Sequence, residues 1–130
     1  MQGAPQAPRV RRLLVLDDDA FVGVLVQNIA QLAGLDTQLT ADPAAFFAAA
    51  QEWQPELLFV DLQMPTMTGE GVLRGLALRQ CSGRVIISSG AGVHRLAEAA
   101  EVARSCGLTL AGTLPKPFLP AALRALLASP

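Results

Sequence analysis

Two short apolar runs that each end in carboxylates constrain this chain more than any other feature. Leu13–Leu16 is followed by three consecutive aspartates, and Leu57–Val60 is followed by Asp61. Unbroken apolar runs of this length are typical of strands buried on both faces of a parallel sheet. The carboxyl ends of parallel strands share one edge, and neighbouring strands lie about 4.8 Å apart. If these two strands are neighbours, their acids converge, and the mutual repulsion favours a bound cation.

Strand-like and helix-like segments alternate along the chain. The patterns predict strands at 13–16, 36–40, 57–60, 84–88 and 109–111, and helices at 20–33, 43–51, 69–80, 93–106 and 119–128. This alternation predicts an α/β fold, a doubly wound parallel sheet with helices on both faces. A length of 130 residues fits one domain. We expect residues 1–9, which are rich in Pro and Ala, to be a disordered tail and residues 10–130 to form the domain.

Helical spacing supports two of these helices in particular. In the helix at 20–33 it gives an apolar stripe made of Phe21, Leu25, Ile29 and Leu32. In the helix at 93–106, opposite charges lie three residues apart at Arg95/Glu98 and at Glu101/Arg104. Such spacing indicates ion pairs along a solvated face.

Composition excludes several classes of function. The net charge is −1 and no basic stripe occurs, so we expect no direct binding of nucleic acid. No stretch approaches the ~18 apolar residues of a membrane span, so we expect no membrane insertion. Cys81 and Cys106 have neither zinc-site nor disulfide-framework spacing. These features together predict a cytoplasmic protein.

The acids at the two strand ends predict a particular chemistry. Asp17, Asp18 and Asp61 offer only oxygen ligands, which suits Mg²⁺ or Mn²⁺. Two carboxylates 4–5 Å apart repel by roughly 3–4 kcal/mol at an effective dielectric constant of about 20. A hydroxyl at Ser88 or Ser89 and the ammonium of Lys116, the only lysine, follow later strands and can reach the same edge. Carboxylate, cation, hydroxyl and ammonium are the parts that phosphoryl transfer requires.

In these segments the chain resembles the receiver domain of two-component response regulators. The matching stretches, in the family's order and spacing, are Leu14–Asp19, Asp61–Gly69, Val85–Gly90 and Lys116-Pro117-Phe118. The resemblance implies a CheY-like, flavodoxin-like (βα)5 fold with strand order 2-1-3-4-5. That order makes the two acid-ended strands neighbours.

The resemblance also implies roles for the acids. Asp61 would accept a phosphoryl group from a sensor histidine kinase or a phosphotransfer protein. Asp17, Asp18, Asp61 and the backbone carbonyl of Gln63 would hold the Mg²⁺. The domain would then be a signalling module that catalyses only its own phosphorylation and dephosphorylation.

Further roles concern the switch. Ser89 and Lys116 would contact the phosphoryl group, and the Lys116-Pro117 peptide bond would be cis. The output surface would comprise the helix at 93–106, the strand at 109–111 and the helix at 119–128. It would meet an output domain, an effector protein or a second copy of the chain. The position of Thr113 usually holds an aromatic residue in this family, so the usual aromatic switch cannot operate here.

Two alternatives compete with this interpretation. A haloacid-dehalogenase-like phosphatase would use Asp17 as its nucleophile, with Asp19, Ser88 and Lys116 in matching order. That family needs a later acidic pair for Mg²⁺, whereas no acid follows Glu101, and it leaves Asp61 unexplained. The second alternative is a receiver-like docking module that is not phosphorylated, and the complete set of acceptor, acids, hydroxyl and lysine argues against it.

Overall fold

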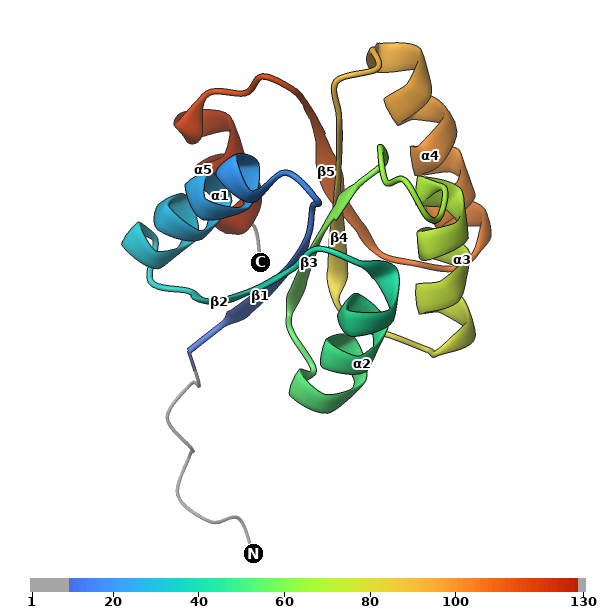
Figure 1. Ribbon diagram of the computed structural model, residues 1–130, viewed down its shortest axis with the longest axis horizontal. Coiled ribbons are helices and arrows are strands. Elements are labelled where there is room, and N and C mark those ends of the chain that lie inside the picture. Colours follow the sequence, from blue (N-terminus) through green and yellow to red (C-terminus); the bar gives the residue numbers. More distant parts are fainter. Residues whose placement is uncertain (1–9, 129–130) are drawn as a thin grey trace, which may run out of the picture.

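The computed structural model describes residues 10–128, which form a single parallel sheet flanked by helices (Figure 1). The elements are β1 (Arg12–Leu16), α1 (Ala20–Leu32), β2 (Asp36–Thr40), α2 (Pro43–Trp53), β3 (Leu57–Asp61), α3 (Gly69–Leu78), β4 (Arg84–Ser89), α4 (Val93–Ser105), β5 (Leu110–Pro115) and α5 (Pro120–Ala128). The sheet order is β2-β1-β3-β4-β5, which confirms the predicted fold. The tail expected at residues 1–9 lies outside the described residues, as do residues 129–130.

The apolar runs of the central strands are buried because helices cover both faces of the sheet. Leu14 and Leu16 of β1 pack with α2, α3 and α4, whereas Leu13 and Val15 pack with α1 and α5. Successive side chains of a strand point to opposite faces, so each strand contributes to both cores. β1 pairs with β3 in register, Leu16 opposite Val60. The next residues, Asp17 and Asp61, therefore emerge side by side.

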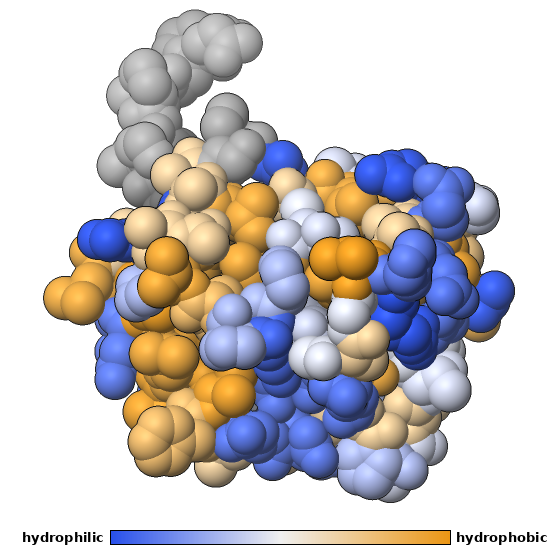
Figure 2. All heavy atoms as spheres, turned by 90° about the horizontal axis from the view of Figure 1, so that it is seen from above, coloured by the Kyte–Doolittle hydropathy of each residue, from blue (hydrophilic) through white to orange (hydrophobic). Residues whose placement is uncertain are grey.

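The helix predicted at 20–33 is confirmed, but most of the apolar residues whose spacing predicted it do not face the core. Phe21 and Leu32 are 86% and 89% exposed, and Leu25 is also exposed, while only Ile29 of the stripe is buried. The buried face is made instead by Gly23, Val26, Ile29 and Ala30. α1 carries no charged residue, so its apolar pattern does not select one face, and the smaller residues allow closer packing on the sheet. Seen from above, hydrophobic side chains gather over the α1 side of the molecule (Figure 2).

β5 is longer than predicted. It continues to Pro115, past the expected end at residue 111, because Thr113 pairs with Ile87 and Pro115 with Ser89. β5 is an edge strand, where a proline that cannot donate a hydrogen bond is tolerated. Thr113 therefore lies inside a strand of the sheet. The other boundaries differ from the predictions by at most two residues; the strand at 84–88, for example, ends at Ser89, and α2 extends to Trp53.

The described helices are short or charged, and none between residues 10 and 128 is long and apolar enough to cross a membrane.

Two glycines inside helices test the packing differently. A Cβ added at Gly75 in α3 would lie 2.4 Å from the ring of Phe47, which is buried, whereas one at Gly23 in α1 would meet Leu39 at an ordinary 3.6 Å. We expect Gly75→Ala to lower the free energy of unfolding by about 1–3 kcal/mol, because the core cannot absorb the extra methyl group. The matched Gly23→Ala should raise it by up to about 1 kcal/mol, because alanine favours helix. Urea unfolding measures both, and equal effects would contradict this packing.

Candidate functional site

Three carboxylates converge at the carboxyl edge of the sheet. Ligand oxygens of Asp17, Asp18 and Asp61 all lie within 4.8 Å of one another. Asp17 follows β1 and is 4% exposed, Asp61 ends β3 and is 2% exposed, and Asp18 is exposed. The convergence follows from the pairing of β1 with β3, since the two strands end at the same level.

Local hydrogen bonds fix the orientation of the two buried acids. Oδ1 of Asp17 accepts from the backbone N–H of Asp19 at 2.9 Å, and Oδ1 of Asp61 accepts from that of Gln63 at 3.1 Å. Such bonds to the residue two positions on are typical of aspartates in turns. Asp19 has a different task, because its Oδ1 accepts from Phe21 N–H and caps α1.

Lys116 brings a positive charge into the acidic cluster from the end of β5. Its Nζ lies 2.8 Å from Oδ2 of Asp17 and 3.4 Å from Oδ1 of Asp61. Lys116 N–H donates to the carbonyl of Ser89 at 2.9 Å, which ties the ends of β4 and β5 together. The Lys116-Pro117 peptide bond is cis.

The charges at this edge do not balance. Burial raises the pKa of Asp17 above its ordinary value of 3.8, and the nearby charge of Asp61 adds to this, outweighing the hydrogen bonds from Lys116 and Asp19. Burial alone would lower the pKa of Lys116, but the hydrogen bond and charge of Asp17, together with Asp61, raise it overall. The two raised pKa values are consistent with each other, because one ammonium lies beside more than one carboxylate. The charged form of Lys116 is therefore favoured, whereas the charged form of Asp17 is not.

The donor set fits a divalent cation. Three carboxylates against one ammonium leave a formal charge of −2, which one dication would neutralise. All available ligand atoms are oxygens, as Mg²⁺ and Mn²⁺ prefer. Exposed Asp18 leaves the cluster open to solvent on one side, which gives an ion a path of entry.

The two serines that end β4 point to different partners. Both are buried, but the hydroxyl of Ser88 donates to the carbonyl of Leu114 at 2.7 Å across the β4–β5 pair. Oγ of Ser89 accepts from the backbone N–H of Ala91 at 3.0 Å, within the loop that follows β4. Ser88 is thus engaged within the sheet, whereas the hydroxyl of Ser89 contacts the loop that follows β4.

Two contacts near the site have no counterpart in the sequence-based predictions. The side-chain carbonyl of Gln63 accepts from Gly90 N–H at 3.1 Å, so the loops after β3 and β4 touch. Arg95 does not join Glu98 as predicted but pairs with Glu70 of α3. The other predicted pair, Glu101 with Arg104, forms at 2.9 Å. Sequence spacing finds only partners on the same helix, which is why the Arg95 contact was missed.

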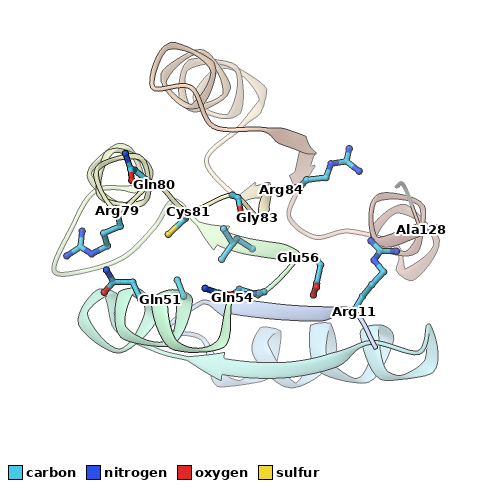
Figure 3. A pocket seen from close by; sticks show the side chains of 14 residues that line it. Arg11, Gln51, Gln54, Glu56, Arg79, Gln80, Cys81, Gly83, Arg84 and Ala128 are labelled. Carbon is cyan, nitrogen blue, oxygen red and sulfur yellow. The ribbon is translucent and has the colours of Figure 1, made fainter. Parts of the chain in front are cut away.

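A cavity of about 870 Å³ lies at the opposite, amino-terminal edge of the sheet (Figure 3). Its wall includes Arg79, whose guanidinium stacks 4.0 Å from the ring centre of Phe47 and donates to the carbonyl of Gly75. Cys81 also lines it, and burial raises the pKa of this thiol, which disfavours the reactive thiolate. The cavity lacks the convergent acids found at the other edge.

The unbalanced charge at Asp17 predicts an effect on stability. Folding raises the pKa of Asp17. The contribution of this residue to the free energy of unfolding is therefore fully present below pH 3.8 and is lost as the pH rises through the raised pKa. We expect Asp17→Asn, which cannot ionise, to be more stable than the parent protein at pH 7 in EDTA. The advantage should vanish in acid. Urea unfolding with exposed Asp36→Asn as control measures it, and a loss of stability at pH 7 would contradict this electrostatic account.

Comparison with known proteins agrees with this geometry. The family model of the response regulator receiver domain matches residues 13–128. The DNA-binding response regulator MtrA of Mycolicibacterium paratuberculosis is 35% identical over 77 residues, which cover 59% of this chain and 33% of MtrA. Protein-glutamate methylesterase/protein-glutamine glutaminase 5 of Myxococcus xanthus is 40% identical over 83 residues, 62% of this chain and 24% of that protein. The chain thus spans only about a third or a quarter of the length of these curated relatives.

Solved structures show the same fold. A response regulator from Colwellia psychrerythraea is 28% identical and superposes with a TM-score of 0.80 over 92% of this chain and 94% of its own. A CheY-like receiver domain protein from Methanospirillum hungatei JF-1 is 21% identical and superposes with a TM-score of 0.78 over 92% of this chain and 91% of its own. At this identity the similarity shows the fold alone. None of these findings supports the phosphatase alternative. The match over nearly all described residues shows that the chain belongs to the response regulator receiver domain family.

Proposed function

We propose that Asp61 is the phosphoacceptor of this receiver domain and takes its phosphoryl group from a phosphohistidine on a sensor histidine kinase or phosphotransfer protein. One observation carries the proposal. The side chain of Asp61 is 3% exposed, its carboxylate lies 3.4 Å from the ammonium of Lys116, and it shares an edge of the sheet with two further acids. A carboxylate so placed is oriented for attack on phosphorus and surrounded by groups that stabilise the transferred charge.

The reaction is a displacement at phosphorus. A carboxylate oxygen of Asp61 forms the new O–P bond while the P–N bond to the donor imidazole breaks, and its electron pair stays on the imidazole nitrogen. Oδ1 already contacts Gln63 N–H and Lys116, so Oδ2, which takes part in neither contact, is the oxygen we assign to the attack. Lys116 then exchanges part of its contact with Asp61 for a phosphoryl oxygen.

The acidic cluster supplies the cation site. Asp17, Asp18 and Asp61 would hold Mg²⁺ or Mn²⁺, with the backbone carbonyl of Gln63 as a further ligand. When bound, the ion neutralises negative charge on the phosphoryl oxygens. Asp17 keeps Lys116 beside Asp61 while contributing to this site.

Ser89 and the loop after β4 would form the switch. In the structure Oγ of Ser89 accepts from Ala91 N–H, so its own proton is free to rotate toward a new acceptor. Phosphoryl oxygens at Asp61 offer that acceptor and draw Ser89 with the loop inward. Gly92 has φ +106°, which a glycine adopts without strain, and marks the hinge before α4.

The output surface would comprise α4, β5 and α5. A hollow of about 320 Å³ lies between α4 and β5, lined partly by Leu96, Ala100 and exposed Thr113. The short side chain of Thr113 leaves the hollow open to an output domain, an effector or a second copy of the chain.

The same proposal defines which reactions the domain catalyses. The domain catalyses its own phosphorylation and dephosphorylation and acts on no other substrate. We place it in the cytoplasm with its kinase, consistent with Cys81 and Cys106, which are unpaired in the described part of the chain.

Labelling with a small phosphodonor tests the acceptor. Incubation of the protein with acetyl phosphate and Mg²⁺ should add the mass of one phosphoryl group, and EDTA should prevent the addition. Asp61→Asn should abolish labelling because the amide is not a nucleophile. Intact-mass spectrometry measures both. Labelling that persists in Asp61→Asn but disappears in Asp17→Asn would favour the phosphatase-like alternative instead.

Two adjacent aspartates provide a matched test of the metal site. Asp18→Asn should weaken Mg²⁺ binding by about tenfold or more, because one anionic ligand is lost. Asp19→Asn should leave Mg²⁺ affinity nearly unchanged, since Asp19 caps α1 and Asn caps helices equally well. Isothermal titration calorimetry measures both affinities. Equal losses in the two variants would rule out the assignment of Asp18.

A further inference from the structure

An ion pair joins the first turns of α3 and α4. The two terminal nitrogens of the Arg95 guanidinium, Nη1 and Nη2, each donate to one carboxylate oxygen of Glu70, Nη2 at 2.7 Å. The side chains are only 29% and 20% exposed. Paired bonds of this kind fix geometry as well as charge. By contrast, Glu101 and Arg104 on the same helix make a single bond and are 74% and 59% exposed.

The position of the pair connects the two loops that border Asp61. α3 begins after the loop that follows Asp61, and Glu70 is its second residue. α4 begins after the loop that follows Ser89, and Arg95 is its third residue. The pair therefore ties the segment behind the acceptor to the segment behind the switch serine.

Electrostatics shows that Arg95 depends on Glu70. A positive charge in the first turn of a helix is disfavoured by the helix dipole, whereas a negative charge there is favoured. Glu70 occupies a favourable place in α3, and Arg95 an unfavourable one in α4. The hydrogen bond from Arg95 lowers the pKa of Glu70, and the same bond raises that of Arg95.

Apart from the buried side chain of Leu96, the start of α4 has few contacts that hold it. Its N-cap, Gly92, offers no side-chain hydrogen bond, unlike the caps Asp19, Asp42 and Thr68 of the preceding helices. The loop before it contains Gly90 and Gly92, so the backbone can turn there with low strain. The Glu70–Arg95 pair is thus the main polar tether on the first turn of α4 that the described residues show.

We propose that the Glu70–Arg95 pair is a latch that holds α4 in its unphosphorylated position and is released when the loop after β4 closes on the phosphoryl group. This inference rests on the proposed function of Asp61. Release moves the first turn of α4, which carries Val93 and Leu96 of the hollow beside β5. The state of Asp61 thereby reaches the output surface without an aromatic residue at position 113.

Beryllofluoride with Mg²⁺, which mimics the phosphoryl group on a carboxylate, tests the latch. The amide NMR signals of Gly90 and Gly92 report binding and give the half-saturating concentration of beryllofluoride. Glu70→Gln and Arg95→Gln should each lower it by about threefold to tenfold, because a tether of the resting state is removed. The double variant Glu70→Arg/Arg95→Glu restores the pair with charges exchanged, and should return the value to within about twofold of the parent protein.

The control is Glu101→Gln, which breaks the exposed pair on the same helix and should leave the value unchanged. A cooperative thermal unfolding transition establishes that each variant is folded. If a single variant does not fold, the double variant with exchanged charges still tests the latch. Unchanged or weaker binding in both single variants, or failure of the exchanged pair to restore the value, would overturn the latch while leaving Asp61 as acceptor. Failure of the parent protein to saturate would instead overturn the proposed function of Asp61.

Discussion

One ammonium facing several carboxylates is the interaction on which the rest of the site depends. Lys116 lies between Asp17 and Asp61, the two buried acids that β1 and β3 bring to the same edge of the sheet. It neutralises part of their repulsion, which lowers the cost of burying both acids. It leaves enough negative charge to hold a dication. This incomplete balance lowers stability, and the fold keeps an unfavourable acidic cluster at the edge where we propose that a cation and a phosphoryl group bind.

The sequence predicts this edge well because it depends on backbone pairing. Apolar runs ending in Asp17 and Asp61 indicate neighbouring parallel strands, and the pairing Leu16–Val60 follows. The spacing in α1 predicts the helix but not its buried face, because a helix without charges offers more than one apolar face and packing selects the one with Gly23 and Ala30. β5 was predicted too short because Gly112 and Pro115 interrupt its pattern, although an edge strand tolerates both.

Sequence spacing alone does not predict contacts between distant segments of the chain. Arg95 has a suitable partner at Glu98 on its own helix, yet it pairs with Glu70, 25 positions earlier on another helix. Gln63 likewise contacts Gly90 across two loops. Such contacts depend on how α3 and α4 pack, which local pattern does not determine. They also occupy the segments that we propose to move after phosphorylation, so the least predictable part of the site is the part we associate with switching.

Locating the modified residue tests the central claim most directly. Borohydride reduction of the protein after phosphorylation by a phosphohistidine donor converts an aspartyl phosphate into a stable product, which peptide mass spectrometry assigns to one position. The account predicts modification at Asp61 alone. Modification at Asp17, or at neither residue in the presence of Mg²⁺, would contradict it.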